Sequence, residues 1–395
     1  AVANVVTTGA FTIPLMKKNG YSATSAAAVE AVASTGGQIM PPVMGAAAFL
    51  MAEMTSVSYG KICLAALIPA LFYFLSIFLM VDLEAKRENI PVAEDSEIMP
   101  IGKVLKAGGY LLLPLILLIT LIITGKSAIF AAAYSIAAIL IVDIIFNKDR
   151  IHVFNRFFKA IAKGMKSVIS VAAACACAGI ICGIISLTGI GSKFSSLMLS
   201  VAGDNIFIAL LMTMLASLIL GCGLPTTAAY MVLAVLAVPA LTKIGVPMLA
   251  AHLFVLYFGS ISTITPPVAL SAYAGAALAR ANPNKVGFRA FRFGLIAFII
   301  PFMFVYSSPL LMEGGALAIA QGVVTGCIGV LCIAICVQGY LITSAGIIER
   351  IAAFAAGLLL IFSGLVTDLI GFALFAVIIL LQVIRKKKAA AAPAV

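Results

Sequence analysis

The stretch that decides the fold is SISTITPP, at Ser260–Pro267, which interrupts a long apolar run. A second interruption, STGGQIMPP at Ser34–Pro42, ends on the same pair of prolines and breaks another apolar run. Glycine lowers helix stability and proline has no amide hydrogen to donate, so a helix that enters either stretch ends there and a new one begins after it. Each stretch therefore predicts a broken helix.

Both breaks lie in a chain that has the composition of a membrane protein. Of its 395 residues, 64% are hydrophobic and only 10% are charged, and the mean hydropathy is +1.22. Apolar runs of roughly 20 residues, the length that spans a bilayer as a helix, recur along the whole chain. This composition excludes a water-soluble enzyme. We expect an all-α polytopic membrane protein that is not an enzyme.

The apolar runs give the order of the predicted helices. Three of them are too long for one crossing and contain Gly and Pro clusters: 22–56 and 246–279, which hold the two breaks, and 204–243, which we interpret as a re-entrant hairpin. The other runs predict single helices at 1–16, 59–82, 106–124, 127–147, 167–190, 293–311, 316–343, 351–366 and 368–384.

The net charge of +11 indicates orientation rather than nucleic-acid binding. Basic residues gather at 148–166, 280–292 and 385–388, beside apolar runs, as cytoplasmic loops do. The charge-balanced connection at 83–105 reads as an ordinary cytoplasmic loop. We expect a multi-pass protein of a bacterial or archaeal cytoplasmic (inner) membrane, with the C-terminus in the cytoplasm and the lipid bilayer as its surroundings.

An internal repeat relates residue n to residue n+225. The identical pairs are Pro14 with Pro239, Lys18 with Lys243, Gly20 with Gly245, Ile39 with Ile264, Pro41 with Pro266, Pro42 with Pro267, and Val43 with Val268. When the crossings between the basic loops are counted, the two copies traverse the membrane in opposite directions. Inverted-topology repeats with broken helices are typical of secondary transporters.

The breaks are where we expect an ion or a substrate to bind. Unwound backbone leaves carbonyl groups that lipid cannot satisfy, so they must face protein, water or an ion. Hydroxyl groups in the second break add neutral oxygens of the kind that a hard cation such as Na⁺ accepts; they belong to Ser260, Ser262, Thr263 and Thr265. The alternative is a proline-kinked helix whose Ser and Thr side chains bond to their own backbone.

The predicted hairpin has the tip GCGLPTTAAY, at Gly221–Tyr230. Pro225 is followed by Thr226 and Thr227 at the start of the returning arm. A helix N-terminus at this position has free amide groups and a positive dipole end, which attract a carboxylate.

The repeat also explains the first residues of the chain. Thr226 corresponds to Ala1, so residues 1–16 are interpreted as the returning arm of a first hairpin, and the chain is expected to be N-terminally incomplete. The nearest polar groups of that arm are Asn4, Thr7 and Thr8.

Few ionisable residues lie inside the apolar runs, namely Glu30, Glu53, Asp143, His252 and Asp368. Each is a candidate for proton transfer. Asp143 and Asp368 lie near the ends of their runs and are expected to reach the membrane interface, whereas His252 is read as a hydrogen-bonded core residue in preference to a coupling group. The eight cysteines lie in apolar runs and predict neither a disulfide framework nor a metal site.

Three stretches carry a family resemblance: GYSATSAAAVEAVASTGGQIMPPVMGAAAFLMAE at 20–53, GCGLPTTAAYMVLAVLAVPAL at 221–241 and AAHLFVLYFGSISTITPPVALSAYAGAALA at 250–279. They resemble the large, DctM-like membrane subunit of TRAP transporters (tripartite ATP-independent periplasmic transporters), specifically the fused permeases that work with TAXI-type binding proteins. The resemblance implies an elevator-type transport domain and Na⁺-driven import of small organic anions. It also implies delivery by a periplasmic TAXI-type binding protein and a small membrane subunit fused in the missing N-terminal part.

The resemblance further assigns site residues. A first Na⁺ site would use Gly37, Gln38 and Met40, mostly through backbone carbonyls, and a second would use Gly221, Gly223, Thr226, Ser262 and Thr265. The candidate substrate contacts are Asn4, Thr7, Pro41, Pro42, Pro225, Thr227, Ser260, Thr263, Pro266 and Pro267. In the family a Ser-Gly-Ser element directly precedes the residue aligned with Ala1, and this chain lacks it. No cofactor other than the coupling Na⁺ is expected.

The expected organisation has four parts. Residues 1–82 form the remainder of the first repeat, 83–166 the connecting helices and a basic cytoplasmic arm, 167–311 the second repeat, and 312–395 additional helices with a basic tail. The predicted function is Na⁺-coupled import by a TRAP permease. The alternatives are an inverted-repeat dicarboxylate symporter that works alone, H⁺ coupling in place of Na⁺, and a channel or non-transporting membrane scaffold.

Overall fold

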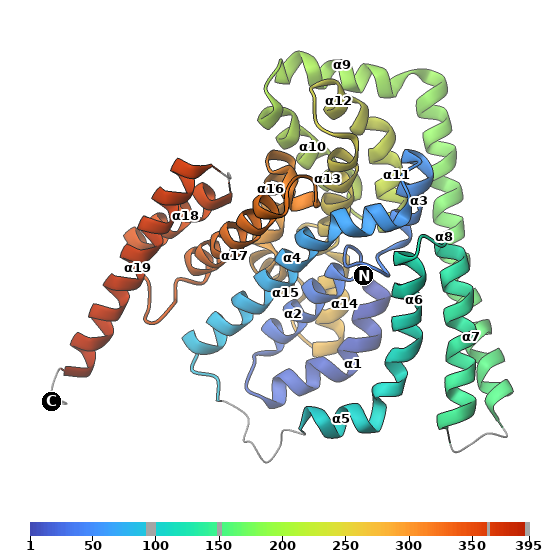
Figure 1. Cartoon of the computed structure of the whole chain (residues 1–395), viewed down its shortest axis with the longest axis horizontal. Helices are drawn as coiled ribbons and strands as arrows, with labels where there is room; N and C mark the ends of the chain where they lie inside the picture. The colour runs from blue at the N-terminus through green and yellow to red at the C-terminus, as the bar shows by residue number, and fades with distance from the viewer. Residues whose placement is uncertain (92–99, 148–151, 362–363, 392–395) are drawn as a thin grey trace.

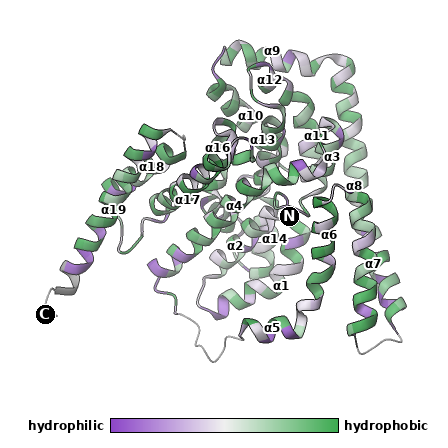
Figure 2. Ribbon diagram, viewed as in Figure 1, coloured by the Kyte–Doolittle hydropathy of each residue, from purple (hydrophilic) through white to green (hydrophobic). Residues whose placement is uncertain are grey.

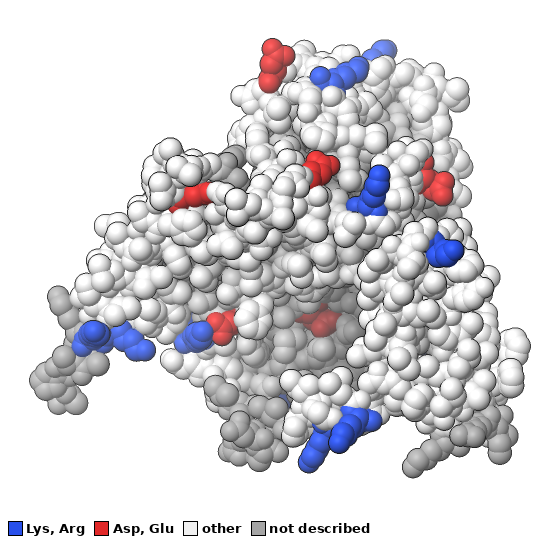
Figure 3. Space-filling view, in the orientation of Figure 1, with Lys and Arg blue, Asp and Glu red and all other residues white. Residues whose placement is uncertain are grey.

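The computed structural model describes residues 1–91, 100–147, 152–361 and 364–391. In this part of the chain nearly all elements are helices, and the β-pairing it contains is an isolated bridge between Tyr340 and Ser344 (Figure 1). The helices are apolar along most of their length (Figure 2). Figure 3 shows a face that is largely uncharged, with Lys and Arg side chains scattered near its upper and lower edges and on its right side. The predicted all-α fold is confirmed.

The helices follow the order of the apolar runs. The first half of the chain contains α1 (Val2–Lys18), α2 (Ala23–Gly36), α3 (Ala46–Thr55), α4 (Tyr59–Arg87), α5 (Ile101–Gly108), η2 (Gly109–Leu112), α6 (Leu113–Ile123), α7 (Ala128–Phe146) and α8 (Val153–Thr188). The second half contains α9 (Ile190–Ala202), α10 (Ile206–Gly221), α11 (Thr226–Leu236), α12 (Val238–Lys243), α13 (Met248–Ile261), η3 (Ser262–Ile264), α14 (Leu270–Ala279), α15 (Pro283–Phe293), η4 (Leu295–Phe298), α16 (Ile300–Tyr306), η5 (Ser308–Leu311), α17 (Ala316–Gln338), α18 (Ile347–Ile361) and α19 (Leu365–Ala391).

Six helices of the described chain are long and apolar enough to cross a membrane: α4, α5 to α6 together, α7, α8, α17 and α19. Large apolar side chains point outward from several of them, such as Ile129 on α7 and Leu187 on α8, which are 84% and 89% exposed. Water does not favour such faces, whereas lipid does. The protein is therefore a multi-pass membrane protein.

The two copies of the repeat form equivalent helices. Adding 225 to both ends of α2 gives the two ends of α13. By the same offset, α1 corresponds to α11 together with α12, and α3 corresponds to α14 within one residue. The hairpin formed by α10 and α11 lies at the position that the sequence predicts.

The copies pack against each other with opposite chain directions. α1 packs against α2 and α14, and its counterpart α11 packs against α13 and α3. Near the start of α2, Ala27 faces Gly275 of α14, where a β-carbon would come 2.8 Å from the Ala27 carbonyl oxygen. Near the end of α2, the Thr35 hydroxyl lies 3.3 Å from that of Thr263 in η3. The two broken helices are therefore antiparallel, as inverted copies are expected to be.

Several helices extend into charged stretches that the sequence predicts as loops. α4 continues to Arg87 and α5 begins at Ile101, so the connection at 83–105 is partly helical, although 92–99 lie outside the described residues. Likewise, α8 and α15 include most of the first two basic stretches. Hydropathy detects the apolar part of a helix and misses ends that carry charged side chains.

The predicted single helix at 293–311 is wrong. The segment is divided into η4, α16 and η5, and α15 is bent by 59° relative to Leu295–Tyr306. Pro301 and Pro309 remove amide donors inside this segment. Gly294 stands at the bend, where a β-carbon would come 2.7 Å from Ile264 Cδ1.

The two acidic residues expected at the interface differ from each other. Asp368 is only 6% exposed and accepts a hydrogen bond of 2.9 Å from Gln321 Nε2 of α17, so its side chain faces a neighbouring helix. Its place near the end of an apolar run did not reveal that α17 covers it. Asp143 is partly exposed and forms an ion pair of 3.0 Å with Arg156 of α8.

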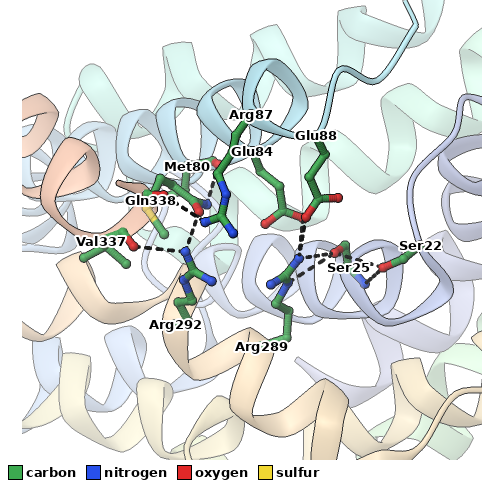
Figure 4. Close-up of polar contacts among 10 residues, drawn as sticks. All are labelled: Ser22, Ser25, Met80, Glu84, Arg87, Glu88, Arg289, Arg292, Val337 and Gln338. Carbon is green, nitrogen blue, oxygen red and sulfur yellow. Dashed lines mark hydrogen bonds and ion pairs between the residues drawn. The ribbon is translucent and has the colours of Figure 1, made fainter. Parts of the chain in front are cut away.

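An ion pair joins the second copy of the repeat to α4 (Figure 4). Arg289 of α15 donates from Nη2 to Glu84 Oε1 at 3.1 Å and to Glu88 Oε1 at 3.2 Å. It also donates to the hydroxyl of Ser25 in α2 at 3.1 Å. Only 2% of the Glu84 side chain is exposed, so Arg289 is its main source of charge compensation.

The same cluster reaches α17 through Gln338 (Figure 4). Arg292 donates to Gln338 Oε1 at 2.9 Å, and Arg87 donates to the Gln338 carbonyl at the same distance. Gln338 Nε2 in turn donates to the carbonyl of Met80 at 2.8 Å. The ends of α4, α15 and α17 are thereby held together at one side of the molecule.

The Arg289 ion pair makes a stability prediction. Arg289→Ala leaves Glu84 buried without a cation, and we expect it to lower the free energy of unfolding by about 3 kcal/mol. Lys285→Ala, an exposed position on the same helix, should change it by less than about 0.5 kcal/mol. Thermal unfolding of the detergent-solubilised protein measures both. Adding Glu84→Gln to Arg289→Ala should restore part of the lost stability. Equal stability of Arg289→Ala and Lys285→Ala would contradict the assignment.

Candidate functional site

The two breaks and the hairpin tip come together in the structure. The first break separates α2 from α3, and the second separates α13 from α14. Within the hairpin tip, Cys222–Pro225 joins α10 to α11. Because α11 packs against both α3 and α13, residues at the tip are within reach of both breaks.

Gln38 links the first break to the hairpin tip. Its Oε1 accepts a hydrogen bond of 3.0 Å from Thr226 Oγ1, and its carbonyl accepts one of 2.9 Å from the Gly45 amide. A β-carbon on Gly45 would lie 2.6 Å from Gln38 Oε1, so the glycine leaves the space that the amide occupies. A residue assigned to the first ion site thus contacts one assigned to the second.

Ser262 links the second break to the other arm of the hairpin. Its hydroxyl lies 3.1 Å from the carbonyl oxygen of Gly221 and 2.8 Å from that of Gly259. A β-carbon on Gly221 would come 2.6 Å from Ser262 Oγ, so only glycine permits this approach. Gly223, two residues further, has φ +81°, which glycine adopts without strain.

The threonine hydroxyls of the second break bond to the backbone of their own segment, which is the alternative that the sequence left open. Thr263 donates to the Ser260 carbonyl and Thr265 to the Ile261 carbonyl, each at 2.8 Å. Their hydroxyl oxygens retain lone pairs that can accept a donor or bind a cation. Ser260 is 1% exposed, and its hydroxyl has no hydrogen-bond partner within the described residues.

A tyrosine hydroxyl caps a proline carbonyl in each break. Tyr59 donates to the Pro42 carbonyl at 2.7 Å, and Tyr273 donates to the Pro267 carbonyl at 2.5 Å. The two tyrosines are not related by the repeat, because one belongs to α4 and the other to α14. Sequence reasoning missed both tyrosines. The signal that could have found them is a tyrosine that lies within about one helix of a break along the chain.

Sequence reasoning also missed a cation beside the first break. Pro41, Pro42 and Lys61 line one cavity with a volume of about 540 Å³. The remaining wall is formed mainly by apolar residues of α4 and α6, such as Leu64 and Ile122. Lys61 is exposed at the start of α4.

Some predicted residues are not joined to the breaks by a hydrogen bond in the described chain. Thr7 is exposed and bonds to the Ala3 carbonyl in its own helix, and Thr227 is buried in α11. The Met40 carbonyl accepts the Met44 amide at 3.1 Å. By contrast, the side-chain amide of Asn4 donates a hydrogen bond to the Ser34 hydroxyl of the first break.

The chemistry of the site is that of neutral oxygen ligands. The described residues contain no group of three or more His, Cys, Asp or Glu side chains that could hold a metal ion. His252 is buried and shares a hydrogen bond of 2.8 Å with the Tyr230 hydroxyl, which fits its interpretation as a core residue. Carbonyl, hydroxyl and amide oxygens are ligands of hard cations.

An inverted repeat whose broken helices meet at their breaks, with a helical hairpin reaching both, is the architecture of membrane transporters that use ion gradients. The comparison with protein families agrees with this class. The family described as "Tripartite ATP-independent periplasmic transporter, DctM component" matches residues 1–317. The chain belongs to this family and is the large permease component of a TRAP transporter. Its family works with a periplasmic binding protein and a small membrane subunit. No curated protein matches the chain in a sequence search.

The contact between Gln38 and Thr226 makes a testable prediction. Thr226→Val and Gln38→Met each remove one partner of the hydrogen bond, so the double variant should lose less stability than the sum of the single losses. We expect an interaction energy of about 1 kcal/mol, the net value of such a bond. Thermal unfolding of the four proteins measures it. Thr242→Val, which removes a hydroxyl from α12, should be additive with Gln38→Met; additivity at Thr226 as well would disprove the contact.

Proposed function

We propose that the chain is the permease of a TAXI-type TRAP transporter that imports small organic anions with Na⁺. The observation that carries this proposal is the junction of Gln38 with Thr226 and of Ser262 with Gly221. It joins both breaks to one hairpin through neutral oxygens. A cation bound there would hold the hairpin tip against the breaks, so ion binding and closure of the hairpin would occur together.

The two proposed Na⁺ sites lie on the two sides of this junction. The first uses Gly37, Gln38 and Met40, mostly through carbonyl oxygens. The second uses the tip and the second break, with Gly221, Gly223, Thr226, Ser262 and Thr265. The Ser262 and Thr265 hydroxyls already donate to backbone carbonyls, which leaves their lone pairs for the cation. Thr226 would contribute to the second site while its hydroxyl contacts Gln38 of the first.

Features of the second break and the hairpin support an anionic substrate. Pro225 precedes α11, and no side chain caps this helix, so its first amides are available to a carboxylate. The Ser260 hydroxyl is buried and unsatisfied among the described residues, and Thr263, Pro266 and Pro267 lie beside it in the chain.

Beside the first break, Lys61 contributes a positive charge to the cavity lined by Pro41 and Pro42, which also favours an anionic substrate. Asn4 of α1 donates to the Ser34 hydroxyl at 3.0 Å, which brings that helix to the same break.

The resemblance and the packing support a proposal for the partners and the motion. A TAXI-type binding protein would deliver the substrate, and the small subunit would be fused to the large one. The antiparallel packing of α2 with α14 favours movement of both copies of the repeat as one unit, which is what an elevator mechanism requires.

Uptake by the complete transporter in proteoliposomes tests the proposal. We expect accumulation of labelled substrate only when the binding protein and an inward Na⁺ gradient are both present. Uptake that ignores the Na⁺ gradient would disprove the coupling. Uptake that does not need the binding protein would favour a symporter that works alone.

Thr265→Val tests the second Na⁺ site. Loss of one oxygen ligand should raise the Na⁺ concentration for half-maximal uptake about tenfold, which corresponds to about 1.4 kcal/mol. Thr120→Val is the matched control, because Thr120 makes the same bond to a carbonyl four residues earlier, at 2.8 Å, but lies on α6. Equal Na⁺ dependence in the two variants would rule Thr265 out as a ligand.

Lys61→Ala tests the proposed anion contact. Removing the cation from the cavity should raise the substrate concentration for half-maximal uptake about tenfold and leave the Na⁺ dependence unchanged. Lys193→Ala, on α9, is the control for the loss of one positive charge. A substrate dependence that is unaltered in Lys61→Ala would exclude this cavity from the substrate path.

A further inference from the structure

Glu30 is a buried carboxyl group that the proposed Na⁺ and substrate sites do not use. It lies in α2, one helical turn before Ser34 of the first break, and is 6% exposed. Three hydroxyl groups surround it: those of Thr8 and Thr12, from α1, each contact one carboxyl oxygen, and that of Ser34 lies 3.0 Å from Oε1. A β-carbon on Gly9 would come 3.1 Å from Glu30 Cγ, so the glycine lets the two helices approach.

Glu30 forms no ion pair with a positively charged side chain in the described part of the chain. α14 and η3, which also pack against α2, contain no charged residue. The charged residues of the other helices packed against α2 are Lys17 and Lys18 on α1, Lys285, Arg289 and Arg292 on α15, and Lys61, Asp82, Glu84, Lys86 and Arg87 on α4.

The hydroxyl groups around Glu30 have fewer hydrogens than contacts. Thr8 lies 2.8 Å from the Asn4 carbonyl and Thr12 lies 3.1 Å from the Thr8 carbonyl, in addition to their contacts with the carboxyl group. A hydroxyl donates one hydrogen. If both threonines donate to the backbone, their oxygens face the carboxyl oxygens without a hydrogen between them. A proton on Glu30 supplies one of the two missing hydrogens, because the acid then donates to one threonine oxygen.

The same atoms also suit the ionised form. When the hydroxyls of Thr8, Thr12 and Ser34 turn toward Glu30, they donate three hydrogen bonds to the carboxylate. Rotation of hydroxyl hydrogens thus changes the cluster from one form to the other without displacing a heavy atom.

We propose that Glu30 is a proton-binding site of the transport unit, which takes up a proton on one side of the membrane and releases it on the other. This inference rests on the proposed transport function. A neutral carboxylic acid avoids the cost of carrying an uncompensated charge through the apolar interior. The Thr8, Thr12 and Ser34 hydroxyls position the carboxyl group and stabilise both of its forms.

The first test needs no variant. Dicyclohexylcarbodiimide reacts with protonated carboxyl groups in apolar surroundings, so the complete transporter is treated with it at several pH values and analysed by peptide mass spectrometry. We expect labelling of Glu30 that falls at least about tenfold as the pH rises through the range in which the site loses its proton. Glu53, an exposed carboxylate on α3, is the internal control and should be labelled little. Absence of pH-dependent labelling at Glu30 would overturn the proposal.

The second test measures proton movement. Proteoliposomes that contain the complete transporter and an entrapped pH-sensitive dye are given substrate, binding protein and Na⁺ at zero membrane potential. Wild-type protein should acidify the lumen as substrate enters, and Glu30→Gln should reduce this proton influx at least about tenfold. Glu53→Gln is the control and should leave it unchanged. Glu30→Asp, which retains a carboxyl group, should keep part of the influx if Glu30→Gln impairs folding.

The outcomes separate this proposal from the proposed function. Proton influx that is equal in wild type, Glu30→Gln and Glu53→Gln would overturn the role of Glu30 while leaving Na⁺-coupled import intact. Uptake that requires a proton gradient and ignores Na⁺ would instead disprove Na⁺ coupling, and the role of Glu30 would stand if its labelling depends on pH.

Discussion

The structure depends on one constraint: a helix that unwinds inside a membrane leaves backbone groups that lipid cannot satisfy. Here the protein satisfies them itself. A tyrosine hydroxyl bonds to Pro42 in the first break and another to Pro267 in the second, while the Gly45 amide returns to the Gln38 carbonyl. Unwound backbone is therefore retained where a second element lies within hydrogen-bonding distance.

The inverted repeat places hydrogen-bonding partners beside each break. Because the copies are antiparallel, the middle of one broken helix meets the middle of the other, and Thr35 faces Thr263 there. The hairpin arm α11 lies against one half of each broken helix. A single copy would expose its break on one side, whereas two inverted copies enclose both.

The sequence predicted the elements that obey a strong local rule. Paired prolines and glycines end helices, so the two breaks and the hairpin were predicted at their correct positions, and the offset of 225 residues was sufficient to predict the correspondence of α2 with α13. The family resemblance of three stretches agrees with the match to the DctM component over residues 1–317.

The features that escaped prediction depend on neighbours far away in the chain. The sequence does not show that α17 covers Asp368. Nor does it show that Lys61 lines a cavity together with Pro41. The site was predicted only in part for the same reason. Gln38 and Thr226 were assigned to separate ion sites, and 188 positions separate them in the chain, yet they share a hydrogen bond.

The approach of Gly275 to Ala27 bears on how the molecule acquires its structure. The two backbones touch there without an intervening side chain, so the apolar interior of one copy is completed by the other. Neither copy is then an independent folding unit. During synthesis, α2 must wait, with one flank uncovered, until the more than two hundred further residues that include α14 have been made.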